Sequence, residues 1–279
     1  MIMDFLMGIE IKKPLHLFLV GIFLSSISVF ISMALFAHAP SMVVVTFMTI
    51  PSIYVFTNLL KKKSVQETKL HSIRKLFETN ADIAELYLLL FLGMSIGVAF
   101  WYSVLPQEMT QILFSEQLYN LRQLGVSTAA AVQPDIFMII AMNNIKLVIL
   151  CTILSFIFGA GALFILSWNA SVVGVAIGII ITKIKATGTA IHLAIMQGFS
   201  VGTAYYILHL VPEVVAYFYA AVAGAFIASA VMRYKPFSPN SNRLIGISFL
   251  LLGIAIALIL VGALIETQIS HAIQATYRV

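Results

Sequence analysis

The stretch KLVILCTILSFIFGAGALFIL, residues Lys146–Leu166, decides the class of this chain. It is 21 residues long and its one charged side chain, Lys146, stands at its first position. A helix rises about 1.5 Å per residue, so a helix of this length crosses a hydrocarbon layer about 30 Å thick. We therefore predict that this stretch spans a membrane.

The rest of the chain has the same character. Hydrophobic residues make up 61% of the sequence and charged residues 10%, whereas soluble domains carry roughly 25% charged residues. The composition excludes a soluble globular protein and predicts an all-α, polytopic membrane helix bundle with about seven transmembrane helices. Besides Lys146–Leu166, the predicted spans are 15–36, 41–60, 84–105, 169–182, 212–232 and 244–265, of which the span at 169–182 can extend through Lys183 and Lys185.

Two further apolar segments are poorly placed for spans. Asp135–Met142 is short, follows Pro134 and stops at Asn143, while Thr187–His209 is interrupted by glycines and Gln197. We predict that both are short interfacial or re-entrant helices on the outer side, since irregular backbone is tolerated at membrane depth only where protein or water covers it.

The sequence divides into three parts. Residues 1–60 are predicted to form an N-terminal transmembrane hairpin, and residues 83–279 a larger transmembrane bundle. Residues 61–82 link them, with apolar positions near helical spacing between Lys and Arg, which indicates a basic amphipathic helix on the inner leaflet or a plain connector. The longest outer segment, Pro106–Pro134, is polar enough for a gate, a docking surface or a spacer.

The distribution of basic residues predicts the orientation, because Lys and Arg accumulate on the cytoplasmic side. With a cytoplasmic N-terminus, seven spans and an external C-terminus, eleven basic residues are cytoplasmic and five are external. The external set is Arg122, Lys146, Lys183, Lys185 and Arg278. The net charge of +5 thus lies in short segments between spans, which excludes a nucleic-acid partner and leaves the lipid bilayer as the main one.

Five polar residues are predicted to gather at the outer ends of spans: Asn143, Asn144, Lys146, His209 and Glu213. The two asparagines can cap one span, and Pro212 suits the first position of another, with Glu213 at its positive end. An ion pair between Lys146 and Glu213 is one hypothesis, and plain helix capping is the alternative.

No catalytic, cofactor-binding or metal site is predicted. His209 and Glu213 are separated by a proline, and His192 is 17 residues from His209, unlike the two-histidine pattern of zinc peptidases. The single cysteine, Cys151, lies in an apolar stretch and cannot form an intramolecular disulfide. We expect a protein that is not an enzyme.

Small residues recur at four-residue spacing in three predicted spans, a pattern that lets transmembrane helices approach closely. The glycines of this pattern are Gly93, Gly97, Gly174, Gly178 and Gly224. They predict tight helix packing, with one face available for a second copy.

Several of these residues recur as an ordered set. The set runs from Asn143-Asn144 through Phe158-Gly159-Ala160-Gly161 and Trp168-Asn169-Ala170 to HLVPEVVAYFYAAVAG at His209–Gly224. It resembles the stage II sporulation protein M family over roughly 80–235, in the form of its archaeal members, although many members have Gly where this chain has Leu210. The resemblance implies a multi-span membrane protein without known catalysis, whose founding branch anchors cell-wall hydrolases.

Two functions remain open. The resemblance favours a non-enzymatic scaffold or anchor that assembles with a membrane protein partner or with itself. The interrupted outer segments and small-residue faces are also typical of a permease-like transporter subunit. Against transport, the predicted spans carry no charged residue near the middle of the membrane.

Overall fold

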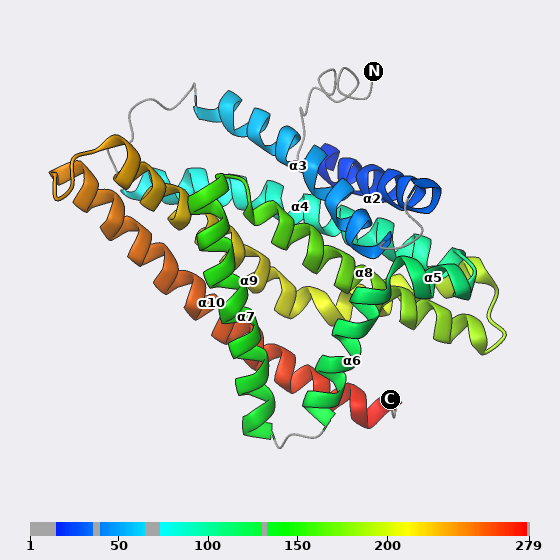
Figure 1. Cartoon of the computed structure of the whole chain (residues 1–279). Coiled ribbons are helices and arrows are strands. Elements are labelled where there is room, and N and C mark those ends of the chain that lie inside the picture. Colours follow the sequence, from blue (N-terminus) through cyan, green and yellow to red (C-terminus); the bar gives the residue numbers. More distant parts are fainter. Residues whose placement is uncertain (1–14, 36–39, 65–72, 130–132, 278–279) are drawn as a thin grey trace. The chain divides into compact units, whose positions relative to one another are not determined.

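The described part of the chain is helical. The computed structural model describes residues 15–35, 40–64, 73–129 and 133–277, which form the helices shown in Figure 1. The all-α membrane bundle predicted from the sequence is confirmed. The helices are α2 (Leu15–Leu35), α3 (Pro40–Ser64), α4 (Ile73–Val104), α5 (Gln107–Leu113), α6 (Ser115–Ala129), α7 (Gln133–Phe158), α8 (Ala162–Ala186), α9 (Ile191–Arg233) and α10 (Pro239–Tyr277).

Six helices of the described chain are long and apolar enough to cross a membrane. Their apolar parts are Leu15–Leu35, Ala81–Val104, Ile136–Phe158, Ala162–Ala186, Tyr206–Arg233 and Pro239–Gln268. The second predicted span corresponds to a shorter apolar stretch, Pro40–Val55 within α3. Helix α8 continues through Lys183 and Lys185 in its last turn, so this span reaches 25 residues.

The prediction that Lys146–Leu166 forms one span is wrong, because two helices meet inside it. Helix α7 ends at Phe158 and α8 begins at Ala162. Between them Gly159 has φ +69°, a left-handed conformation that glycine adopts without steric cost and that commonly ends helices. Its N–H donates to the carbonyl oxygen of Ser155 at 2.9 Å and closes the last turn.

The prediction of two separate interfacial helices is also wrong, because both segments belong to longer helices. Residues 135–142 belong to α7, which runs without interruption from Gln133 through Asn143 and Asn144. Residues 191–209 belong to α9, a continuous helix of 43 residues with Pro212 inside it. The polar residues that suggested helix ends are therefore interior residues of long helices.

The chain forms two compact units. One comprises Met1–Leu118 with Ser167–Ala186, and the other Tyr119–Leu166 with Thr187–Val279. The predicted division at 60 and 82 stays a prediction. Residues 65–72 lie outside the described residues, as do the side chains of 61–80, so the predicted basic amphipathic helix does too.

In the first unit, α2 packs along α4. The two helices cross where Gly21 faces Gly93, and a Cβ built on Gly93 would lie 3.1 Å from the Cα of Gly21. Further along, the indole Nε1 of Trp101 donates to Oγ of Ser26 at 2.9 Å. The ring of Trp101 also meets Phe30 edge to face, with centroids 4.6 Å apart.

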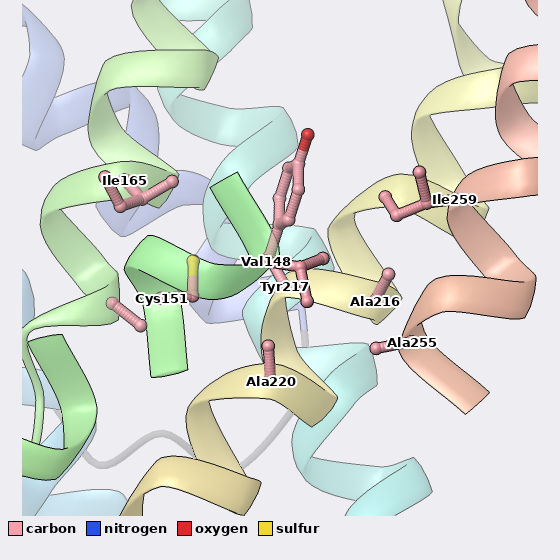
Figure 2. Packing of buried hydrophobic residues seen from close by; sticks show 9 residues of the cluster. Val148, Cys151, Ile165, Ala216, Tyr217, Ala220, Ala255 and Ile259 are labelled. Atoms are coloured by element: carbon pink, nitrogen blue, oxygen red, sulfur yellow. The ribbon is translucent and has the colours of Figure 1, made fainter. Parts of the chain in front are cut away.

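In the second unit, α7, α9 and α10 enclose an apolar core together with the first turn of α8. Helices α9 and α10 run antiparallel and side by side (Figure 1). Figure 2 shows Tyr217 of α9 among the apolar residues of the core, with its hydroxyl pointing away from Ala220. The fully buried residues of this cluster are Val148, Cys151, Ala162, Ile165, Ala216, Tyr217, Ala220, Ala255 and Ile259.

Candidate functional site

A hydrogen-bonded polar cluster lies within the second unit. The Nδ2 of Asn144 on α7 donates to Oε1 of Glu213 on α9 at 2.8 Å. The hydroxyl of Tyr217, one turn after Glu213, donates to Oδ1 of Asn144 at 2.6 Å. Both polar atoms of the Asn144 side chain are thus hydrogen-bonded. Its NH2 group donates to the carboxylate of Glu213, which can only accept, and its oxygen accepts the proton of the Tyr217 hydroxyl.

The cluster is buried inside spanning helices. Asn144, His209 and Glu213 are 6%, 3% and 5% exposed, so none of them faces the surface. Asn144 follows Ile136, the start of its span, by eight residues, which is about 12 Å along the helix. Glu213, which accepts a hydrogen bond from Asn144, is ionisable. Ionisable groups inside a membrane are costly and are typically paired and functional.

Helix α10 completes the cluster. Glu266 on α10 is close enough to Glu213 to act on it electrostatically, so two carboxyl groups neighbour each other. One turn earlier, Gly262 leaves room for this approach. A Cβ built there would lie 2.9 Å from Cγ of Glu213 and 3.3 Å from the carbonyl oxygen of His209.

The structure brings together three of the five polar residues predicted from the sequence. Asn144, Glu213 and His209 are buried in the same unit, and His209 lies one turn before Glu213 on α9. Asn143 and Lys146 are exposed, because successive residues of a helix are rotated by about 100° and these two turn away from the face that carries Asn144. The hypothesis of an ion pair between Lys146 and Glu213 is therefore wrong: Lys146 is exposed and the described partner of Glu213 is Asn144.

The predicted capping roles are wrong as well. Asn143 and Asn144 lie in the interior of α7, and Pro212 lies in the interior of α9. Glu213 is thus not at a helix N-terminus. The spans do carry ionisable residues away from their ends: Glu213 stands seven residues inside the span Tyr206–Arg233, and Lys146 ten residues inside the span Ile136–Phe158.

Sequence reasoning missed Tyr217 and Glu266. Tyr217 follows Glu213 by four residues and shares its face, a signal that is visible once α9 is taken as continuous. Glu266 follows Gly262 by four residues in the same way. The last predicted span, 244–265, ends one residue before Glu266, but α10 continues to Tyr277.

The predicted packing glycines lie at helix crossings. A Cβ on Gly93 or Gly97 of α4 would meet Phe18 or Ser25 of α2. On α8, a Cβ on Gly174 would lie 2.6 Å from the carbonyl oxygen of Ser95, and one on Gly178 would lie 2.7 Å from the ring of Tyr102. In the second unit, a Cβ on Gly224 of α9 would meet the carbonyl oxygen of Thr152 on α7.

The chemistry available to the polar cluster is that of hydrogen bonds and carboxyl groups. Across the described residues, no group of three or more His, Cys, Asp or Glu side chains is placed to hold a metal ion. Two carboxyl groups, an amide, a phenol and an imidazole can exchange hydrogen bonds and bind a proton or a small cation.

Long apolar helices that enclose a polar cluster define a polytopic helical membrane protein. The family model described as Stage II sporulation protein M matches residues 87–271, about two thirds of the chain. The chain therefore belongs to the stage II sporulation protein M family. The match includes α10, which the resemblance noted over 80–235 had left out. No curated protein and no solved structure matches the chain.

Proposed function

We propose that this chain is a non-enzymatic scaffold of a membrane complex, which holds a protein partner at the bilayer. The observation that carries the proposal is the brevity of the segments between spans. The connections after α7, α8 and α9 are the residues 159–161, 187–190 and 234–238. A partner therefore has two places to bind in the described chain: the spans, and the helices α5 and α6 between α4 and α7.

Helix α5 is suited to such a contact. It follows Pro106 directly and carries Glu108 in its first turn, so it is not an apolar span. Met109 and Ile112 are nevertheless 43% and 55% exposed. The two residues are three positions apart, so they share one face of the helix and offer a small apolar surface to a partner.

Photo-crosslinking tests this proposal. The full chain carries a photoreactive phenylalanine at Met109 or Ile112 and is irradiated in its native membrane, with Phe249 of α10 as a control position of 69% exposure. A surface- or wall-modifying protein captured at the α5 positions and not at Phe249 supports the scaffold. Capture of lipid alone at every position contradicts it.

A permease-like subunit is the second candidate, and the cluster of buried Asn144 and Glu213 with half-buried Glu266 favours it. Carboxyl groups inside spans mark ion and proton pathways in many transporters. The test is proton flux into vesicles that contain the purified chain and a pH-sensitive dye. A flux that Glu213→Gln abolishes and Glu108→Gln leaves unchanged supports transport, since Glu108 is exposed outside the spans. Copurification with a nucleotide-binding subunit would also select this candidate.

We also propose the orientation with the N-terminus in the cytoplasm and the C-terminus outside, with α3 as the seventh crossing. Lys146 lies inside the span Ile136–Phe158, so the proposal rests on eleven cytoplasmic and four external basic residues. In a Cys151→Ala background, Lys185→Cys and Lys235→Cys place a thiol at opposite ends of the spans. An impermeant maleimide should label position 185 in intact cells and position 235 only after the membrane is opened. Labelling of 235 first reverses the orientation.

A further inference from the structure

The turn between α9 and α10 holds a strained aromatic residue. Phe237 has φ +59° and is the one non-glycine residue of the described chain with a positive φ. The N–H of Ser238 donates to the carbonyl oxygen of Lys235 at 3.1 Å, which closes a four-residue turn with Pro236 second and Phe237 third. A third turn residue with positive φ is normally glycine, because a side chain there is strained.

The side chain of Phe237 projects from the turn. Phe237 is 89% exposed, more than any other large apolar residue described. The backbone N–H of Ser241 donates to the Ser238 hydroxyl at 3.3 Å, and Nδ2 of Asn242 donates to the carbonyl oxygen of Phe237 at 3.4 Å, so the first turn of α10 holds the end of this turn. Strain that the surroundings maintain at an exposed position indicates a function for that side chain.

Three basic residues lie in this turn or at the helix ends next to it. Arg233 ends α9, Lys235 lies in the turn and Arg243 lies in the second turn of α10, and all three are exposed. The hydroxyl of Ser241 reaches the carbonyl oxygen of Ala230 at 3.5 Å, so the last turn of α9 and the first turn of α10 are side by side. The three cations therefore belong to one layer at the end of the helix pair.

No acidic residue balances this layer on its own helices. Between Glu213 and Glu266 the sequence contains no Asp or Glu. The spans that flank the turn end at Arg233 and begin at Pro239, so the turn lies at the boundary of the hydrocarbon layer. Phospholipid phosphates are the anions present at that depth, and aromatic rings are favoured there.

We propose that the α9–α10 turn is a binding site for the headgroup of an anionic phospholipid. Arg233, Lys235 and Arg243 contact the headgroup phosphate, and Phe237 inserts its ring among the neighbouring acyl chain ends at the interface. The site fixes the depth of this end of the helix pair in the membrane.

The charge part of the site is tested with the full chain in detergent, to which phosphatidylglycerol or phosphatidylcholine is added. We expect phosphatidylglycerol to raise the unfolding temperature more than phosphatidylcholine does. The variant with Arg233→Gln, Lys235→Gln and Arg243→Gln should lose this difference. Its affinity for phosphatidylglycerol in native mass spectrometry should fall roughly five-fold for each cation removed.

The matched control removes three exposed cations elsewhere, through Arg122→Gln, Lys183→Gln and Lys185→Gln. This control should keep the preference for phosphatidylglycerol. The proposal is overturned if the wild type responds equally to both lipids, or if the control variant loses the preference as fully as the turn variant. An acidic soluble protein is the alternative ligand of a basic turn. The proposal is also overturned if the turn variant still binds phosphatidylglycerol but no longer binds such a protein that the wild type binds.

The aromatic part is tested at Phe237 itself and does not depend on the charge variants folding. Phe237→Gly relieves the positive φ, so its unfolding temperature without lipid should not fall, while its response to phosphatidylglycerol shrinks. An unchanged response overturns the insertion of the ring. In Phe237→Trp, the fluorescence of the new tryptophan is obtained by subtracting the wild-type signal. Lipids brominated near the headgroup should quench this fluorescence more than lipids brominated at the chain end. The reverse order, or no quenching, also overturns the insertion of the ring.

Discussion

The crossing of α2 and α4 allows a sharp test of the packing, through the change Gly21→Ala. A Cβ on Gly21 would lie 2.6 Å from the carbonyl oxygen of Leu90 and 2.7 Å from the backbone nitrogen of Met94. Real Cβ atoms almost never come closer than 3.0 Å, so the helices must separate by at least 0.4 Å at this point. Both contacting atoms are backbone atoms of a helix, and neither can rotate away.

The cost follows from the packing that this separation loosens. A radial gap of about 0.5 Å removes roughly a quarter of the dispersion energy of each contact across the crossing. Insertion of a methyl group into a well-packed core typically costs about 1–3 kcal/mol. Alanine also gains up to about 1 kcal/mol over glycine as a helix former, which offsets part of this cost.

A matched control removes that offset. Gly253 of α10 has no atom within 4 Å of a built Cβ, so Gly253→Ala adds the same methyl group in open space. We expect Gly21→Ala to have a free energy of unfolding about 1–3 kcal/mol lower than Gly253→Ala. The assay is unfolding in mixed detergent micelles as sodium dodecyl sulfate is added, followed by tryptophan fluorescence, since Trp101 lies on α4. Equal stability of the two variants would refute the close approach of α2 and α4.

Three further changes test single features. Tyr217→Phe removes the hydroxyl that donates to Asn144, and should lower the free energy of unfolding by about 1 kcal/mol in the same assay; no loss would contradict the hydrogen bond. Trp101→Phe should cost a similar amount, and in a double-mutant cycle with Ser26→Ala the two effects should not add, whereas full additivity would exclude their contact. Gly159→Ala places a side chain at φ +69° and should cost about 1–2 kcal/mol; an unchanged unfolding midpoint would argue against the break between α7 and α8.

The sequence predicts the class of the fold because lipid sets a simple requirement. Every backbone polar group in hydrocarbon must be paired within its own segment, so long apolar runs become helices. The continuation of α8 through Lys183 and Lys185 was also predictable, because long basic side chains near the end of a span can reach the interface.

The ends of the helices could not be predicted so well. An apolar run does not change its character at a helix break, so the turn at Gly159 is hidden inside Lys146–Leu166. Conversely, the sequence around Asn144 and Pro212 is typical of helix ends, although both residues lie inside long helices. Whether a polar residue in a membrane helix marks an end or an interior contact depends on its partner. The partners of Asn144, Glu213 and Tyr217, are 69 and 73 residues away, and no local pattern contains them.

Helix α9 has a consequence for the membranes in which the chain can reside. Its 43 residues extend about 65 Å, roughly twice the thickness of the hydrocarbon layer. Its first turns expose Ile191, Leu193 and Met196 beside the polar His192 and Gln197. The apolar span Tyr206–Arg233 alone has 28 residues and extends about 42 Å, so tilting of the helix or thickening of the surrounding lipid reduces the mismatch. Lipids with longer acyl chains should therefore suit the chain better than short ones, and differences in thickness between membrane regions are a means of sorting it.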